Sequence, residues 1–255
     1  MSLHTVRVGH GPISYVFLHG LLGQGKNWST IAKALLPAAS LLVDLPDHGR
    51  SAWSADVSYE GMAAAVIDLL RTLEGPVTLV GHSMGGKVAM LVALREPELV
   101  SRLVVVDISP VARATDDFVT YLDAMLALDL DSITTRADAD AVLRAAAPDQ
   151  TVRGFLLQSL QRTENGWTWH PNLVGLRRGL PAIGGWPEIN ETYDGPVLWF
   201  RGARSPYVTE DAVPAMRALF PKVRLVTIKD AGHWVHADQP TVLADSLAHW
   251  VAATA

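Results

Sequence analysis

Ser83 stands in a pattern that can turn a serine hydroxyl into a nucleophile. The run Gly81-His82-Ser83-Met84-Gly85 follows an apolar stretch and precedes a helical pattern that runs to Arg95. A serine at such a strand–turn–helix junction adopts strained backbone angles, and glycines at 81 and 85 remove Cβ atoms that would clash there. The start of the helix offers free backbone N–H groups to a nearby anion. We predict that Ser83 is the nucleophile.

A serine hydroxyl needs a base, and a histidine late in the chain can supply it. His233 follows Gly232 in a loop after the apolar run 223–228. His236 lies three residues further on and is the competing candidate, whereas His82, inside the turn, should point away from the substrate. We predict that His233 is the base.

A glycine-containing loop after the apolar run 13–19 could supply backbone N–H groups to the reaction. Backbone N–H groups from such a loop and from the residue after the nucleophile can bind the oxyanion of a tetrahedral intermediate. We predict that the amides of Leu21 and Met84 do so. The residues expected to line the substrate pocket are His19, Gly20, Tyr207 and Trp234.

Other polar clusters do not predict a metal site. Asp44, Asp47 and His48 occur in one turn, and His233 and His236 have a ligand-like spacing, but neither group has an evident third or fourth ligand. Polar turns of this kind usually form structural hydrogen bonds. We expect no metal and no cofactor.

Alternating strand and helix patterns must position these side chains. Strands are expected at 13–19, 40–44, 77–80, 102–106, 197–200 and 223–228, with helices at 27–36, 59–73, 87–95, 209–219 and 240–252. This rhythm is typical of a mostly parallel, doubly wound α/β sheet. Residues 110–193 instead look helical at 118–128, 137–146, 150–161 and up to Leu180, with a short extended piece at 166–169. We predict a core of residues 1–109 and 194–255 with a helical cap, 110–193, over the strand ends where ligands bind.

The composition narrows the class of partner. The chain has 255 residues, 49% of them hydrophobic, a net charge of −5 and no cysteine. No basic cluster predicts nucleic-acid binding, and no apolar run approaches the roughly 18 residues of a membrane span. The first residues lack the pattern of a secretory signal. We therefore expect a cytoplasmic protein that acts on a small molecule; its oligomeric state is left open.

These motifs together resemble the α/β-hydrolase superfamily over nearly the whole chain. They are His19-Gly20, the run 44–51, Gly81 to Gly85 and Gly232-His233, in the expected order. The runs 107–110, 205–208 and 232–237 look like small bacterial YbfF-type esterases and the related mitochondrial abhydrolase-domain proteins of animals. The resemblance implies hydrolysis of an ester or thioester without a cofactor.

The acid of the expected triad departs from the usual hydrolase arrangement. Most of these enzymes carry it after the strand that follows the cap, but residues 200–206 contain no carboxylate. Asp107 ends the strand before the cap, 24 residues after Ser83, and the YbfF-type resemblance places the acid there. The alternative is that Asp107 caps the turn before Pro110. Glu210 and Asp211 fall in the first turn of a helix, where acidic residues are usually caps. We predict Asp107 as the acid.

The sequence thus favours a serine carboxylesterase or acyl thioesterase that forms an acyl-enzyme. Two other classes stay open: a lyase or C–C bond hydrolase that uses the same triad as a base, and a binding protein that keeps the pocket without catalysis. Haloalkane dehalogenases and epoxide hydrolases are disfavoured because they need an aspartate where Ser83 stands.

Overall fold

A seven-stranded sheet forms the centre of the molecule, in a computed structural model that describes residues 2–254. The strand order is β1-β3-β2-β4-β5-β8-β9, and every neighbouring pair is parallel except β1 with β3. The strands are β1 (Thr5–Val8), β2 (Ile13–Leu18), β3 (Ala39–Val43), β4 (Val77–His82), β5 (Val100–Val106), β8 (Val197–Gly202) and β9 (Val223–Ile228). The expected mostly parallel α/β sheet is confirmed.

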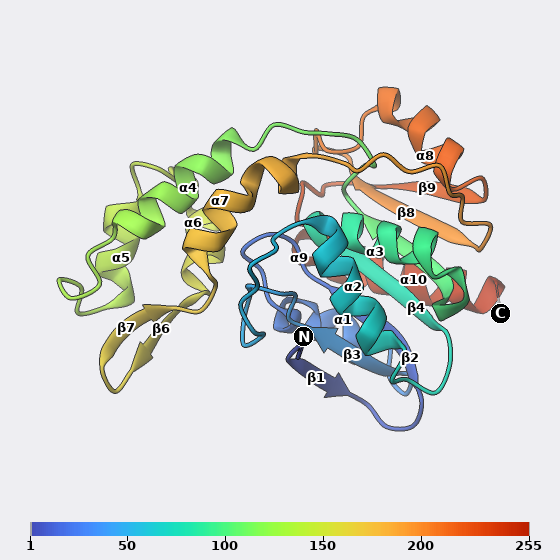
Figure 1. Cartoon of the computed structure of the whole chain (residues 1–255), viewed down its shortest axis with the longest axis horizontal. Coiled ribbons are helices and arrows are strands. Elements are labelled where there is room, and N and C mark those ends of the chain that lie inside the picture. Colours follow the sequence, from blue (N-terminus) through green and yellow to red (C-terminus); the bar gives the residue numbers. More distant parts are fainter. Residues whose placement is uncertain (1, 255) are drawn as a thin grey trace.

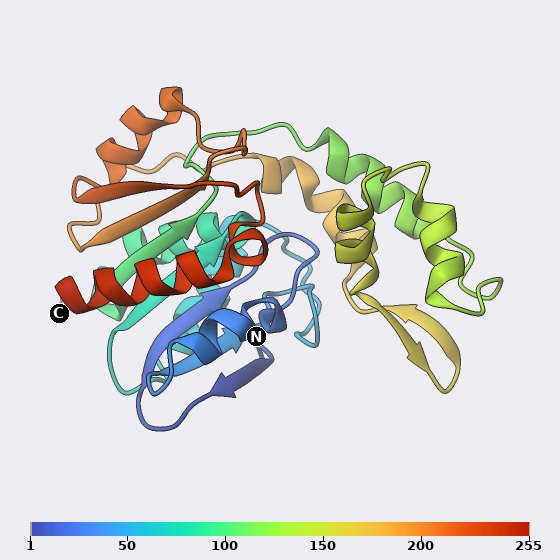
Figure 2. The same ribbon diagram turned by 180° about the vertical axis from the view of Figure 1, so that it is seen from behind.

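Helices cover both faces of this sheet (Figures 1 and 2). On one face lie α2 (Tyr59–Leu70), α3 (Met84–Arg95) and α8 (Val213–Leu219); on the other lie α1 (Ser29–Ala34) and α10 (Pro240–Ala253). Central strands buried on both faces need apolar side chains on both, which explains the continuous valine and leucine runs of β4 and β5. Shorter pieces are the 3₁₀ turns η1 (Gly25–Trp28), η2 (Pro97–Leu99) and η3 (Glu210–Ala212), and α9 (Val235–Asp238).

The segment between β5 and β8 leaves the sheet and folds beside it (Figure 1). We call residues 110–193 the insertion. It contains α4 (Asp116–Ala127), α5 (Arg136–Leu143), α6 (Gln150–Leu157), β6 (Leu160–Thr163), β7 (Gly166–Trp169) and α7 (Leu173–Gly184). Within residues 2–254, no helix is both long and apolar enough to cross a membrane.

The expected helix 150–161 is wrong at its C-terminal end. The helix stops at Leu157, and β6 pairs with β7 as an antiparallel hairpin. The connection passes through Asn165-Gly166, and Gly166 has a φ of 110°, which only glycine adopts without strain. The insertion is therefore not all helical, because this turn favours a hairpin over continued helix.

Several boundaries also differ from the sequence prediction. The edge strand β1, with two exposed positions in four, was not expected because so short a run carries little apolar pattern. The expected helix 27–36 begins as the 3₁₀ turn η1, and α1 ends at Ala34, before Pro37, whose ring disfavours helix at the residue before it. In contrast, α7 continues past Pro181 to Gly184.

Candidate active site

Ser83 occupies the tight turn between β4 and α3. Its backbone has φ 53° and ψ −123°, outside the regions that side-chain-bearing residues normally adopt. A Cβ at Gly81 would overlap the carbonyl of Gly85, and a Cβ at Gly85 would overlap the carbonyl of His19. The two glycines thus let the turn pack against β2 while it presents the serine above the end of the sheet.

Ser83, His233 and Asp107 form a continuous chain of hydrogen-bonding atoms. His233, on the loop between β9 and α9, has its Nε2 3.0 Å from Ser83 Oγ. Its Nδ1 lies 2.7 Å from Asp107 Oδ2. Asp107 directly follows β5 and is fully buried, and its φ of 54° turns its carboxylate toward the histidine loop. Three segments far apart in sequence therefore meet at the carboxyl ends of neighbouring strands.

Asp107 is held by further donors from the strand next to it. The backbone N–H of Gly202 donates to Asp107 Oδ1 at 2.9 Å, and the Ser205 hydroxyl donates to Oδ2. Ser205 stands in the turn that the sequence showed to lack a carboxylate, and its contact with Asp107 was not anticipated. Glu210 forms an ion pair with Arg201 at 2.7 Å and starts η3.

Leu21, on the loop after β2, and Met84, the first residue of α3, line one cavity with Ser83. Within residues 2–254, neither Leu21 N–H nor Met84 N–H donates a hydrogen bond to a protein acceptor. His19 shapes this loop: its Nδ1–H donates to Gly20 O at 2.8 Å, and its Nε2 accepts from Leu45 N–H at 3.0 Å. Burial lowers the pKa of His19, so the ring stays neutral. Although His19 lines the pocket as expected, both its ring nitrogens are taken by the backbone.

The other two nearby histidines, His82 and His236, line the same pocket as Ser83, although His82 was expected to point away from it. His82 Nε2–H donates to the carbonyl of His233 at 2.9 Å, which fixes the loop that carries this histidine. Burial, followed by the charge of His233, lowers the pKa of His82 well below its usual value. His236, the competing base, stacks on Trp28 at 4.8 Å, and burial lowers its pKa to about 4.

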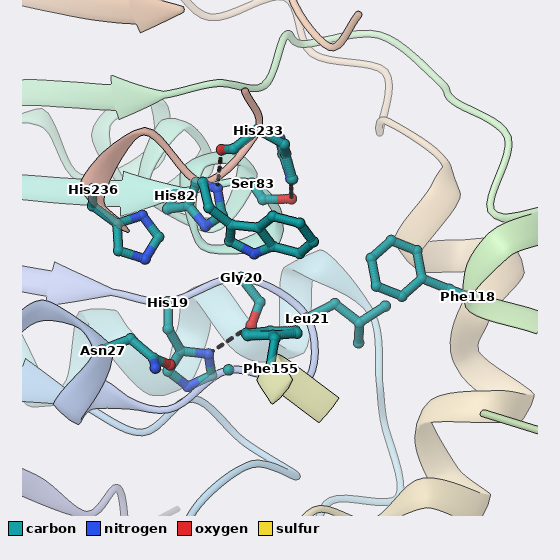
Figure 3. A pocket seen from close by; sticks show the side chains of 12 residues that line it. His19, Gly20, Leu21, Asn27, His82, Ser83, Phe118, Phe155, His233 and His236 are labelled. Atoms are coloured by element: carbon teal, nitrogen blue, oxygen red, sulfur yellow. Dashed lines mark hydrogen bonds between the residues drawn. The ribbon is translucent and has the colours of Figure 1, made fainter. Parts of the chain in front are cut away.

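Aromatic side chains from the core and the insertion enclose the space above Ser83 (Figure 3). Phe118 of α4 lies across it from His236. Phe155 of α6 also lines it and contacts Trp234, with ring centroids 5.4 Å apart. A second, mainly apolar cavity of about 170 Å³ lies between α4 and α6 and shares Phe118, Phe155, His233 and Trp234 with this space. Gly20 and Trp234, two residues that we expect at the substrate pocket, line this region. Phe118 and Phe155 were not expected there, because helix register alone does not reveal which face meets the core.

Tyr207 lies flat against the His233 ring, with centroids 3.7 Å apart and an interplanar angle of 17°. The guanidinium of Arg113 lies 4.0 Å above the other face of Tyr207. Stacking of this kind restricts rotation of the imidazole and keeps its two nitrogens aligned with Ser83 and Asp107.

The aspartates of the turn after β3 accept hydrogen bonds from backbone N–H groups. Asp44 accepts from Gly25 N–H at 2.7 Å and from Arg50 N–H at 2.9 Å, and Asp47 accepts from Ser54 N–H at 3.0 Å. Among residues 2–254, no group of three or more potential ligands is arranged to hold a metal ion.

Comparison with known proteins identifies the family. Residues 16–240 match the family described as alpha/beta hydrolase fold. The chain belongs to the α/β-hydrolase family. This α/β-hydrolase is 40% identical to the sn-1-specific diacylglycerol lipase ABHD11 of Danio rerio over 241 residues, covering 91% of this chain and 76% of the relative. It is 32% identical to Esterase YbfF of Escherichia coli, covering 97% and 96% of the two chains.

A comparison with solved structures also finds an esterase with the same fold. A marine microorganism esterase superposes on this α/β-hydrolase with a TM-score of 0.93, at 32% identity and with 97% and 98% of the two chains covered. The expected resemblance to YbfF-type esterases and abhydrolase-domain proteins is thus confirmed, with esterase and lipase relatives over almost the whole chain.

Proposed function

We propose that this α/β-hydrolase is a serine hydrolase of carboxylic esters or thioesters that works through an acyl-enzyme. The observation that carries the proposal is the chain of atoms from Ser83 Oγ through the His233 ring to Asp107, with separations of 3.0 and 2.7 Å. A nucleophile, a base and an orienting carboxylate in hydrogen-bond contact are the groups that acyl transfer needs.

In the proposed reaction, His233 Nε2 takes the proton from Ser83 as its oxygen attacks the carbonyl carbon. Asp107 accepts from Nδ1–H and stabilises the imidazolium that forms. The amides of Leu21 and Met84, which lack protein acceptors within residues 2–254, donate to the oxyanion. His233 then protonates the leaving group, and a water molecule activated by the same base releases the acyl group.

This chemistry assigns the two halves of the substrate to different sides of Ser83. The leaving group receives its proton from His233, so it lies on the side lined by His233 and Trp234. The acyl group lies on the side lined by Ser83 and the two amide-bearing residues, Leu21 and Met84. We call the cavity on that second side the acyl cavity.

We further propose that the insertion acts as a cap over both sides. Phe118 of α4 lines the acyl cavity and the apolar cavity beside His233, and Phe155 of α6 lines only the latter. Changes in the insertion are therefore expected to alter preference among substrates more than the reaction with a small activated ester.

Labelling with a fluorophosphonate and hydrolysis of 4-nitrophenyl butyrate test the proposal together. The protein should be labelled on Ser83 and should release a burst of 4-nitrophenol. Ser83→Ala should abolish labelling and lower turnover by roughly 10⁴- to 10⁶-fold, since nucleophile and base act as a unit. Ser246→Ala, on α10 behind the sheet, is the matched control and should retain both.

Undiminished turnover in folded Ser83→Ala would contradict the proposal. Absence of both labelling and burst in the unaltered protein would favour a binding protein, and cleavage of a carbon–carbon bond without ester turnover would favour the lyase or C–C hydrolase class. Circular dichroism of each variant separates loss of chemistry from loss of fold.

A further inference from the structure

The acyl cavity contains two positively charged side chains. Lys87, one helical turn after Ser83 on α3, lines it together with Arg113, which lies at the entry to the insertion. The cavity has a volume of about 40 Å³, and Tyr59 and Thr115 add hydroxyl groups to its wall. None of these residues supplies a reacting atom in the proposed chemistry at Ser83, although Arg113 also stacks on Tyr207.

Lys87 is buried, and its ammonium group makes one hydrogen bond to the protein within residues 2–254. Only 1% of its surface is exposed, and its Nζ donates to Gly185 O at 2.6 Å and lies 5.4 Å from the centre of the Tyr59 ring. An ammonium group has three N–H donors, and this contact uses one. Burial, and after it the positive charge of Arg113, lower the pKa of Lys87 to about 8, so the group is still mainly charged at neutral pH.

The contact with Gly185 does not by itself require a charge. Its neighbour in the same segment, Ile183 O, accepts a hydrogen bond of 2.7 Å from the neutral hydroxyl of Tyr59. A neutral donor therefore suffices to hold the end of α7 against the core. An ammonium at position 87 costs more free energy to bury than a hydroxyl does. An interaction besides the hydrogen bond to Gly185 O should therefore offset the cost of burying its charge.

Within residues 2–254, no carboxylate lies within ion-pair distance of either cation, Lys87 or Arg113. Arg113 donates to Pro206 O at 2.9 Å and stacks on Tyr207, which leaves its charge uncompensated. The nearest acids along the chain are Asp116, which lines an outer hollow together with Arg113, and Asp117, which lines the apolar cavity; within residues 2–254 neither forms an ion pair with Arg113 or Lys87.

We propose that Lys87 and Arg113 bind a carboxylate at the far end of the acyl group, so that the preferred substrates are monoesters of short dicarboxylic acids. The inference rests on the proposed function, since it places the ester carbonyl at Ser83 and the Leu21 and Met84 amides. The small cavity limits the acyl group to a few carbon atoms. Charge-assisted hydrogen bonds from both cations fix the end of the chain and thereby align the carbonyl for attack.

An isosteric pair of esters tests this directly. Monoethyl succinate and ethyl 4-methylpentanoate have the same leaving group and the same number of heavy atoms, but the first carries a carboxylate where the second carries an isopropyl group. The protein should hydrolyse monoethyl succinate with at least a 10-fold higher kcat/KM. Lys87→Met should reduce the ratio of the two values at least 10-fold. Lys26→Met, which removes an exposed lysine of η1, should leave the ratio unchanged.

A second variant covers the case in which Lys87→Met fails to fold. Arg113 is only partly buried, and Arg113→Met should also lower the ratio, with the larger effect on KM for monoethyl succinate. Succinate itself should inhibit hydrolysis of 4-nitrophenyl acetate competitively, and more weakly in Arg113→Met. Monoethyl esters of malonate, succinate and glutarate then define the chain length.

The preference should also weaken above the pKa of Lys87. The amine loses its charge as the pH rises from 7 to 9.5, whereas Arg113 keeps its charge, and burial raises the pKa values of Tyr59 and Tyr207 so that both stay neutral. The carboxyl groups that face this region from α4 belong to Asp116 and Asp117. The ratio for the two esters should therefore fall across this range, and any effect of pH on the shared attack step cancels from the ratio.

Equal or better hydrolysis of the neutral ester by the unaltered protein would overturn this inference. Fluorophosphonate labelling of Ser83 and turnover of 4-nitrophenyl butyrate would then still support the proposed function. A ratio that is high but insensitive to both Lys87→Met and Arg113→Met would also overturn it, because the charge would be recognised elsewhere. Loss of labelling and of all turnover would instead contradict the proposed function itself.

Discussion

Asp107 accepts hydrogen bonds from three groups, and each of them constrains a different part of the site. Gly202 N–H fixes Oδ1 to the neighbouring strand, while Ser205 and His233 share Oδ2. The usual position of a hydrolase acid is thus filled by a hydroxyl that supports an acid on the preceding strand. A fully buried carboxylate with all these donors is well placed to hold one tautomer of the imidazole.

Neutralising the Asp107 carboxylate should lower the rate of ester hydrolysis severely. Asp107→Asn is expected to lower kcat by roughly 10⁴-fold, because an amide favours the wrong tautomer of His233 and no longer stabilises the imidazolium. Steady-state hydrolysis of 4-nitrophenyl butyrate measures the effect. Asp211→Asn, in η3, is the matched control and should change the rate little. A mild effect at Asp107 with a large one at Asp211 would mean that the acid has been assigned to the wrong strand.

The site residues differ in how far sequence could predict them. Ser83 and His233 come from short motifs in which local backbone geometry dictates the residues, so each could be named from the chain alone. Asp107 could be named because an expected carboxylate was missing elsewhere. Lys87 could not be assigned a role from the sequence, because its proposed role in binding depends on Arg113. That residue lies 26 positions away and lines the same cavity only because of the path of the insertion.

At the scale of elements, the insertion is fastened to the core at several separate points. Asn172 caps the start of α7 by accepting from Gly175 N–H at 3.0 Å, and its side-chain amide donates to Asp47 Oδ1 at 2.8 Å. Its backbone N–H donates to Asp47 O at 2.9 Å. Elsewhere, Asn27 of η1 donates to Gln158 at 2.8 Å across the mouth of the site. These contacts set the position of α6 and α7 over Ser83.

Two substitutions at Asn172 separate its roles. Asn172→Ala removes both the cap and the donor to buried Asp47, and should lower the free energy of unfolding by about 1–3 kcal/mol. Asn172→Asp keeps a capping oxygen but places a second carboxylate against Asp47, so it should be at least as destabilising. Urea denaturation measures both, with the exposed Asn190→Ala as control. If Asn172→Asp were as stable as the unaltered protein, the cap alone would explain the residue and the contact with Asp47 would contribute nothing.

The elements themselves were predictable in proportion to their burial. β4 and β5 read clearly because both their faces are covered, which demands an unbroken apolar run. The β6–β7 hairpin could not be predicted from the sequence in the same way, because it lies on the surface of the insertion and its residues alternate without a strong apolar face. Its clearest signal was the Asn165-Gly166 pair, which specifies a turn even where the flanking residues specify little.

For the molecule as a whole, the buried neutral histidines near the site link stability to pH. Burial lowers the pKa of His48 to about 3 and that of His236 to about 4, and burial also lowers that of His82. His82 and His236 contact each other with ring centroids 4.7 Å apart, and Nδ1 of His236 is buried with no partner within residues 2–254. Protonating His82 or His236 in the folded state would bury a positive charge beside other histidines.

The sign of the resulting pH dependence follows from which state binds more protons. In the unfolded chain a histidine titrates near pH 6.5, whereas folded His236 resists protonation until about pH 4, so acid favours the unfolded state throughout that window. Stability should therefore be fully retained above pH 7 and fall as the pH drops toward 4, with His236 alone contributing a loss of about 2 kcal/mol between pH 7 and 5.

Urea denaturation at both pH values should show that His236→Phe, which keeps a ring against Trp28, loses less stability over this interval by that amount. His249→Phe, at an exposed position of α10, should lose as much as the unaltered protein; an equal loss in His236→Phe would show that His236 does not titrate in this way.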